Sequence, residues 1–136
     1  MNRTTALDML ARKGYKITGK RETMAHIFWK NHRLLSARAV HNIIKVDSPG
    51  ISLDTVYRNI RLFEELGILE ATELNREKHY CFTSSDHHHP LICIDCGTVK
   101  KIEICPMDHM LDLPKGFLVT GHKFEVYGHC SDCHSS

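Results

Sequence analysis

The sequence contains no membrane span and no recognisable export signal. None of its 136 residues lie in a stretch that approaches the roughly 18 apolar residues of a membrane-spanning helix. The first residues, MNRTTALDML, are too polar for a signal peptide, and no cleavage-like region follows them. We therefore expect a cytoplasmic protein without a membrane partner. Thiols stay reduced in that compartment, so its six cysteines suggest metal or redox chemistry before disulfides.

The chain also lacks the motifs of a metal-dependent hydrolase. It has no HExxH or comparable sequence. A zinc hydrolase that uses the histidines with Glu103 or Asp108 as its base is therefore a remote alternative, and no enzyme is expected. The composition, 42% hydrophobic and 25% charged, is typical of a globular protein.

Charge and metal-ligand residues are unevenly distributed along the chain. Residues 1–83 carry 14 Lys and Arg against 9 Asp and Glu, whereas residues 84–136 carry 4 against 7. The acidic second part holds five of the six Cys and seven of the eleven His. A basic module attracts a phosphate backbone, so the first part is a candidate for DNA binding and the second for metal binding.

Helical periodicity dominates the basic part. Apolar spacing predicts a helix over Thr5–Arg12 and two more that begin after the N-caps Thr18 and Ser36. A fourth helix is expected between Ser52, a good N-cap, and Gly67, a good C-terminal stop.

The fourth helix is the candidate recognition helix. Its buried stripe is predicted to be Leu53, Val56, Ile60 and Phe63. The polar and aromatic residues near its start fall outside that stripe, where a helix in the major groove carries its base-reading side chains. These candidate DNA-binding residues are Thr55, Tyr57, Arg58 and Arg61.

Two strand-like runs follow the fourth helix. Ile68–Leu74 and Lys78–Phe82 are joined by the tight connection Asn75-Arg76-Glu77. Three helices, a basic helix and a hairpin are the order of a winged helix. We expect a winged-helix DNA-binding domain over residues 1–82, a linker over 83–86 and a metal-binding domain over 87–136.

Two CxxC pairs are the strongest signal in the acidic part. Both cysteines of such a pair can reach one tetrahedral ion, and a second pair closes the shell, which indicates a structural zinc site rather than a redox site. The four predicted ligands are Cys93, Cys96, Cys130 and Cys133. The long insertion between the pairs must fold: a short helix is expected from Pro106, and strands over Leu91–Asp95, Val99–Ile102 and Phe117–Tyr127.

A run of three histidines precedes the first pair. Side chains alternate along an extended segment, so His87 and His89 should face one way and His88 the other. One run could then supply two metal sites, although such tracts are also often solvated.

These motifs together resemble the ferric uptake regulator family, most closely its zinc uptake regulator branch. The resemblance spans nearly the whole chain. It is carried by the His run, both CxxC pairs, and the segments Asp54-Thr-Val-Tyr-Arg-Asn59, Glu64-Glu-Leu-Gly-Ile-Leu-Glu70, Cys105-Pro-Met-Asp108 and Gly121-His-Lys-Phe-Glu-Val-Tyr-Gly128.

The resemblance implies an α+β protein: a winged helix followed by a small α/β dimerisation domain with a structural zinc site. It implies a homodimer that binds a two-fold symmetric double-stranded DNA operator when metal is bound. Besides the four-cysteine zinc, it implies one or two regulatory ions. The sensor ligands at the hinge would be Glu70, Cys81 and His88, and those of a third site His87, His89, Asp108 and His122.

One position departs from the family pattern. Pro90 stands where the family supplies a further hinge histidine, so Asp86, a water or another His would complete that site. Because a thiolate at the sensor site favours zinc, we expect a zinc-responsive transcriptional repressor of metal uptake genes. The alternative is an iron, manganese or peroxide sensor of the same family.

Overall fold

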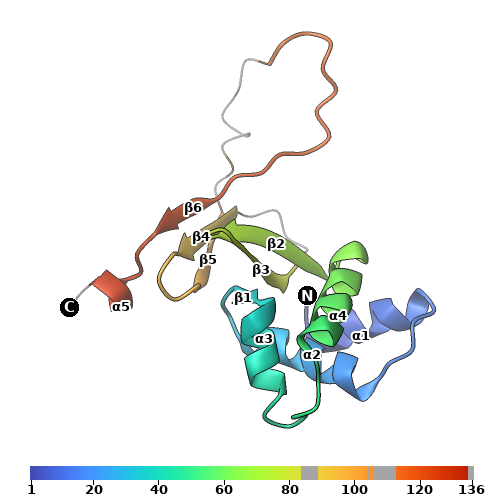
Figure 1. Cartoon of the computed structure of the whole chain (residues 1–136). Helices are drawn as coiled ribbons and strands as arrows, with labels where there is room; N and C mark the ends of the chain where they lie inside the picture. Colours follow the sequence, from blue (N-terminus) through green and yellow to red (C-terminus); the bar gives the residue numbers. More distant parts are fainter. Residues whose placement is uncertain (84–88, 104, 106–112, 135–136) are drawn as a thin grey trace. The chain divides into compact units, whose positions relative to one another are not determined.

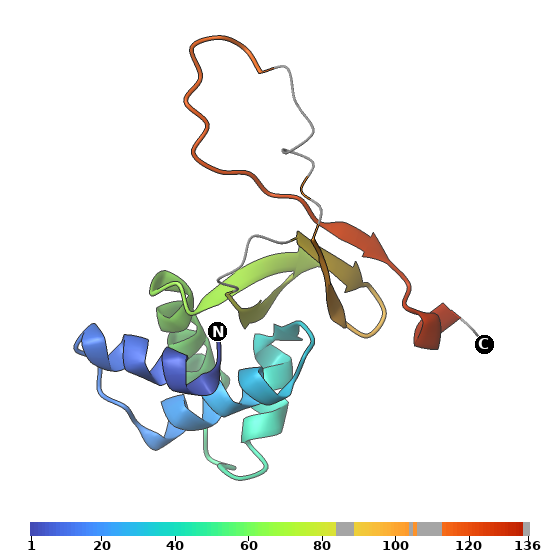
Figure 2. The same cartoon turned by 180° about the vertical axis from the view of Figure 1, so that it is seen from behind.

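The computed structural model of the chain describes residues 1–83, 89–103, 105 and 113–134. The chain divides into two compact units, Met1–Ser85 and Asp86–Ser136 (Figures 1 and 2). The helix predicted from Pro106 lies outside the described residues. Among the helices that are described, none has the length and apolarity needed to cross a membrane.

Four capped helices build the first unit. In each, the side chain of the N-cap residue accepts a hydrogen bond from a backbone N–H of the first turn, which satisfies a donor that the helix itself leaves free. The caps predicted at Thr18, Ser36 and Ser52 are all present. The helices are α1 (Arg3–Arg12), α2 (Gly19–Lys30), α3 (Ala37–Ile44) and α4 (Leu53–Glu65).

The first helix begins earlier than its apolar spacing predicts. The Asn2 side-chain oxygen accepts a hydrogen bond from the backbone N–H of Thr5 at 2.8 Å, so Asn2 is the cap and α1 starts at Arg3. At the other boundary of interest, α4 stops before Gly67, whose φ of 77° lies in the left-handed region that glycine adopts most readily.

A three-stranded antiparallel sheet completes the first unit. Its order is β1-β3-β2, with β1 at Leu35–Ser36, β2 at Leu69–Leu74 and β3 at Glu77–Phe82. Asn75 and Arg76 both have positive φ, as a two-residue hairpin turn requires. The strand β1 was not predicted, because two residues are too short to show any period. Together with α1–α4 this sheet makes a winged helix (Figure 1).

The core of the first unit gathers around α4. Val56, Ile60 and Phe63 are at most 1% exposed and pack in one cluster with apolar residues of α1, α2 and α3. In α3, Ile44 is buried, whereas Ile43 is 39% exposed, since it lies one helical position off the buried stripe. The buried face of α4 therefore fixes which of its residues face solvent.

A second three-stranded sheet forms the other unit. It has the order β5-β4-β6, with β4 at His89–Cys93, β5 at Val99–Ile102 and β6 at Val126–Gly128. The strands β4 and β5 are antiparallel, whereas β4 and β6 are parallel. The short helix α5 (Ser131–His134) follows β6.

The strand predicted over Phe117–Tyr127 is mostly wrong. Within it only residues 126 and 127 pair with β4, and the described residues 113–125 form no strand. Phe117 and Leu118 are 76% and 88% exposed. Their apolar, strand-favouring pattern is real, but a strand needs a neighbouring backbone, and this segment runs outside the sheet (Figures 1 and 2).

The buried position of Phe63 generates a stability prediction. Phe63→Ala should destabilise the first unit by about 3–5 kcal/mol, because it leaves a cavity against α1–α3. The single tryptophan, Trp29 in α2, reports unfolding of this unit by its fluorescence in a urea titration. Val46→Ala, at a position 77% exposed, is the matched control and should leave the midpoint unchanged. Equal midpoints for both variants would contradict this packing.

Candidate metal sites and nucleic-acid interface

Four thiols meet where β4 and β6 end. Cys93 closes β4 and Cys130 follows β6, while Cys96 lies in the turn before β5 and Cys133 in α5. Their four sulfur atoms lie within 4.8 Å of one another, with Sγ–Sγ distances of 3.8 Å for Cys93–Cys133 and 3.8 Å for Cys96–Cys130.

The sheet register brings the two CxxC pairs together. In the parallel β4–β6 ladder Cys93 is the partner of Gly128, two residues before Cys130. The backbone N–H of Ile94 donates to the carbonyl of Gly128 at 2.9 Å, which extends the pairing to the end of both strands. Within the first pair, Gly97 has a φ of 77°, and its N–H donates to the carbonyl of Cys93 at 2.9 Å. The chain can therefore fold back so that Cys93 and Cys96 face one point.

The spacing of these sulfurs suits a tetrahedral metal ion. A zinc ion with Zn–S bonds of about 2.3 Å would hold its thiolates roughly 3.8 Å apart. The observed 3.8 Å separations of Cys93–Cys133 and Cys96–Cys130 agree with that value. All four ligand positions would then be protein thiolates, so the site can hold structure together but offers no open position for catalysis.

Hydrogen bonds shift the pKa values of Cys93, Cys96 and Cys133 in different directions. The backbone N–H of Cys130 donates to Cys93 Sγ at 3.3 Å, which is the main reason that the pKa of Cys93 falls to about 6. The hydroxyl of Thr98 lies 3.0 Å from Cys96 Sγ and lowers the pKa of Cys96. Hydrogen bonding to Cys130 and burial raise the pKa of Cys133. Metal binding by all four sulfurs would require each as a thiolate, including Cys133, and the positive charge of the ion would stabilise that form.

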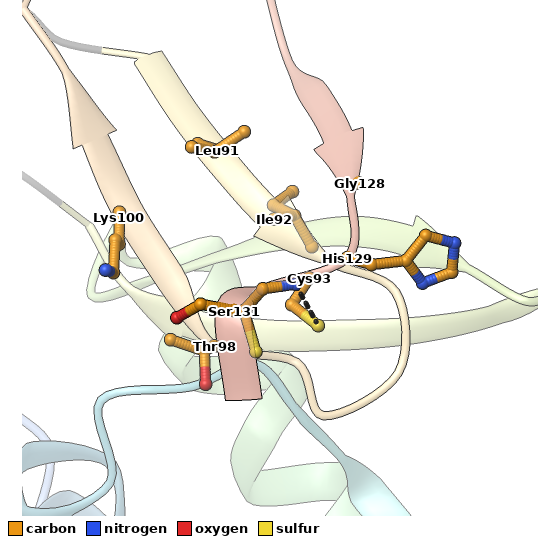
Figure 3. Close-up of a pocket in the computed structure, with 9 residues that line it drawn as sticks. Leu91, Ile92, Cys93, Thr98, Lys100, Gly128, His129 and Ser131 are labelled. Atoms are coloured by element: carbon orange, nitrogen blue, oxygen red, sulfur yellow. Dashed lines mark hydrogen bonds between the residues drawn. The ribbon is translucent and has the colours of Figure 1, made fainter. Parts of the chain in front are cut away.

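A cavity of about 300 Å³ lies beside this cluster. Figure 3 shows Cys93 at its edge, with the dashed hydrogen bond from the backbone of Cys130. Lys100 and Thr98 line it from β5 and the turn before it. His129, also at its edge, has its Nδ1 2.5 Å from Asp95 Oδ2, and this hydrogen bond raises the pKa of His129. The pair ties the turn of the first CxxC to the residue before the second.

A second group of metal-ligand side chains lies elsewhere in the same unit. His89, Cys105 and His122 bring one ligand atom each within 4.8 Å of the others. His89 and His122 were predicted for the third site, and the structure brings them together, with their Nε2 atoms 3.3 Å apart. The other two predicted ligands, His87 and Asp108, lie outside the described residues.

Cys105 was not predicted as a ligand of any site. The signal for it was weak but present, since it was the one cysteine of the acidic part outside both CxxC pairs. Only the folded chain brings it to His89 and His122.

Two of the three predicted sensor ligands are cross-strand neighbours. Glu70 in β2 is the register partner of Cys81 in β3, and Cys81 Sγ lies 4.0 Å from Glu70 Oε1. The third, His88, lies outside the described residues, so this ligand set stays a prediction.

The face of α4 that carries the predicted DNA-binding residues is open to solvent. Tyr57 is 41% exposed, and Arg58 and Arg61 are exposed as well. Thr55 is half-buried, and its hydroxyl bonds to the N-cap Ser52 at 2.9 Å. Arg58 Nε lies 3.2 Å from Asp54 Oδ2, an exposed ion pair that holds the guanidinium along the helix at low cost to break.

Side-chain hydrogen bonds from α2 orient the same helix. The Arg21 guanidinium of α2 donates through Nε to the Asn59 side-chain oxygen at 3.0 Å, and through Nη1 to the carbonyl of Lys16 at 2.7 Å. Asn59 in turn donates to the carbonyl of Thr55 at 3.1 Å. The start of α4, where the candidate reading residues lie, is thus tied to α2.

The winged helix and the four-thiol site define the class of this molecule: a DNA-binding regulator whose second unit is built around metal ligands. The chain belongs to the ferric uptake regulator family, whose profile matches residues 12–127. It is therefore a transcription regulator and not an enzyme, as the sequence predicted.

Similar proteins agree with this assignment. The chain is 41% identical over 134 residues to the ferric uptake regulation protein of Staphylococcus epidermidis. The alignment covers 98% of this chain and 96% of that protein. It is 42% identical over 135 residues to that of Staphylococcus aureus, with 98% of each chain covered.

Solved structures share the fold. The Helicobacter pylori ferric uptake regulator superposes with a TM-score of 0.76 at 18% identity, covering 100% of this chain and 96% of that chain. A zinc-bound manganese uptake regulator superposes with a TM-score of 0.69 at 26% identity, covering 93% and 98%. The first of these likenesses concerns the fold alone, because its sequence identity is low.

The four-thiol cluster generates a prediction for the second unit. Cys96→Ser should remove tightly bound metal and unfold this unit, because structural zinc in small domains contributes roughly 10–16 kcal/mol of binding free energy. Metal content by mass spectrometry and proteolysis of residues 86–136 measure the effect. Cys81→Ser, the same change outside the cluster, is the control and should keep that metal. A Cys96→Ser protein with full metal content and a protected second unit would rule out this role.

Proposed function

We propose that the protein is a zinc-responsive transcriptional repressor, which binds operator DNA as a metal-loaded homodimer and controls metal uptake genes. The observation that carries the choice of zinc is the position of Cys81 directly across from Glu70 in the β2–β3 hairpin. A thiolate beside a carboxylate favours zinc over manganese or ferrous iron, which suit oxygen and nitrogen ligands.

Base reading would be the role of the exposed residues of α4. A recognition helix lies in the major groove with its N-terminal part against the base edges. Arg58 can form a paired hydrogen bond to guanine, and the ring edge of Tyr57 can pack on a thymine methyl. The remaining candidates on this helix are Thr55 and Arg61. The salt bridge between Arg58 and Asp54 is exposed to solvent, so Arg58 can leave it to contact a base.

The metal sites would have separate structural and regulatory roles. The four cysteines would hold a structural zinc ion that stabilises the second unit. The sensor would use Glu70, Cys81 and His88, and the third site His87, His89, Asp108 and His122. A bound ion supplies positive charge and a fixed ligand geometry. By linkage, any tightening of DNA binding by metal must tighten metal binding by the same factor when DNA is present.

A two-fold symmetric operator follows from a dimer of winged helices. Two equivalent recognition helices read half-sites one helical turn apart or multiples of it, and the operator mirrors the symmetry of the protein. Phe117, Leu118 and Val119 form a continuous run of exposed apolar side chains, which supports a dimer because contiguous exposed apolar patches mark interaction sites.

Iron is the second candidate for the sensed metal. The relatives at 41% and 42% identity are both named ferric uptake regulation proteins. This naming favours iron, whereas Cys81 favours zinc. The four-cysteine zinc would be common to both readings.

The choice of metal predicts a selective response. DNA binding to a palindromic operator should rise with buffered free zinc at concentrations where iron, manganese and nickel have no effect. Cys81→Ser should abolish this response and leave the structural metal in place, because it removes the thiolate from the sensor. Fluorescence anisotropy of labelled operator measures binding. A response to ferrous iron at lower free metal than zinc would establish the iron reading instead.

The exposed face of α4 predicts sequence-specific contacts. Arg58→Ala should weaken operator binding by about 1–3 kcal/mol and leave metal content and dimerisation unchanged. Arg12→Ala, which removes the same charge at the end of α1, is the matched control and should have little effect. If Arg58→Ala weakens binding to random DNA as much as to the operator, Arg58 contacts only phosphate.

A further inference from the structure

We propose that Cys105 is a metal ligand, and that with His89 and His122 it forms a regulatory zinc site with a thiolate in its shell. This inference rests on the proposed function and deepens it, because it gives the third site a ligand that the sequence motif did not. It also makes that site selective for zinc by its own chemistry.

The three ligand atoms form a nearly equilateral triangle. Cys105 Sγ lies 3.4 Å from His89 Nε2 and 3.3 Å from His122 Nε2, and the two Nε2 atoms are 3.3 Å apart. A tetrahedral zinc ion with Zn–N bonds of about 2.0–2.1 Å and Zn–S of about 2.3 Å would space such atoms roughly 3.3–3.6 Å apart. The triangle thus has the size of one face of a zinc tetrahedron.

Hydrogen bonds can account for at most two sides of this triangle at once. Each Nε2 is either a donor or an acceptor, and the thiol has a single hydrogen. One imidazole N–H points along its ring plane, so it cannot aim at both the sulfur and the other nitrogen. A cation at the centre, by contrast, attracts a lone pair from each of the three atoms at once.

The surroundings isolate the site from bulk water on one side. His89 is 5% exposed and Cys105 2% exposed. The ring of Phe124 meets the His89 ring edge-on, with centroids 5.4 Å apart. His122 is the exposed member, so an ion can enter from its side. A buried thiol beside two imidazoles, one of which packs against an aromatic ring, is the setting of a ligand and not of a solvated histidine tract.

The three ligands come from three separate segments of the second unit. His89 begins β4, Cys105 follows β5, and His122 precedes β6. Metal binding would therefore fasten both ends of the long β5–β6 connection to the first residue of the central strand. On binding, the Cys105 S–H bond breaks, its proton passes to solvent, and a sulfur–metal bond forms.

A thiolate in the shell determines which ions the site accepts. Zinc and cobalt tolerate mixed sulfur and nitrogen ligands in a tetrahedral arrangement, whereas manganese and magnesium prefer oxygen. Cys105 would therefore make this site prefer zinc over manganese, as Cys81 would at the sensor site.

Cobalt spectroscopy tests the ligand directly and without DNA. In a Cys81→Ser background, with zinc retained in the four-cysteine site, Cys105 is the remaining cysteine that can bind added Co²⁺. Added Co²⁺ should give tetrahedral d–d bands and a near-ultraviolet thiolate-to-cobalt band. Adding Cys105→Ser should abolish the near-ultraviolet band and weaken zinc binding by more than the roughly 10–100-fold that loss of an outer-shell partner costs. A near-ultraviolet band that survives Cys105→Ser, at unchanged structural zinc, would overturn the proposal.

A second measurement leaves all six cysteines in place. Zinc beyond the structural ion should protect Cys105 from alkylation, read by mass spectrometry of its peptide, and His122→Ala should remove that protection. Alkylation of Cys105 at the same rate with and without zinc would contradict ligation even if a variant misfolded. Neither readout involves an operator. Thiolate ligation together with metal-independent DNA binding would therefore refute the proposed function alone.

Discussion

The convergence of four thiols on one point is the constraint on which the second unit depends. Four thiols are held within 4.8 Å of one another near the ends of two parallel strands, where hydrogen bonding lowers the pKa of Cys93 and raises that of Cys133. The sheet there is small, with strands of three to five residues. A metal ion bound by these thiols would be the crosslink that such a sheet needs, because so little apolar surface is buried around it.

The first unit solves a different problem, which is to present one face of one helix. Apolar residues of α4 enter the core. Arg21 of α2 donates a hydrogen bond to Asn59 of α4. The opposite face is left to Tyr57, Arg58 and Arg61. One face of this thirteen-residue helix thus packs in the core, and the opposite face carries the polar surface residues. A change on one face need not disturb the other.

Among the described residues, side chains that could ligate a metal gather in three places, and each lies where strands meet or end. Cys93 closes a strand, His89 opens the same strand, and Glu70 and Cys81 face each other across a hairpin. Hydrogen-bonded pairing of the strands fixes where these ligand side chains start, whether or not the side chains themselves pack against neighbours. In all three groups a thiol is present, which is a common chemical bias toward soft, borderline ions such as zinc.

Local signals in the sequence determined helices α2, α3 and α4 with their caps, the hairpin and the two CxxC pairs, but not the start of α1 or the helix α5. Caps such as Ser52 and ligand pairs such as Cys93 and Cys96 act over three residues or fewer, so their pattern survives in one dimension. The family, too, followed from the order of such motifs. Tertiary structure decided the rest: that β1 joins the wing, that residues 117–125 do not form a strand in this chain, and that Cys105 meets His89 and His122. Those outcomes depend on which backbone lies alongside which, a long-range property that no local period encodes.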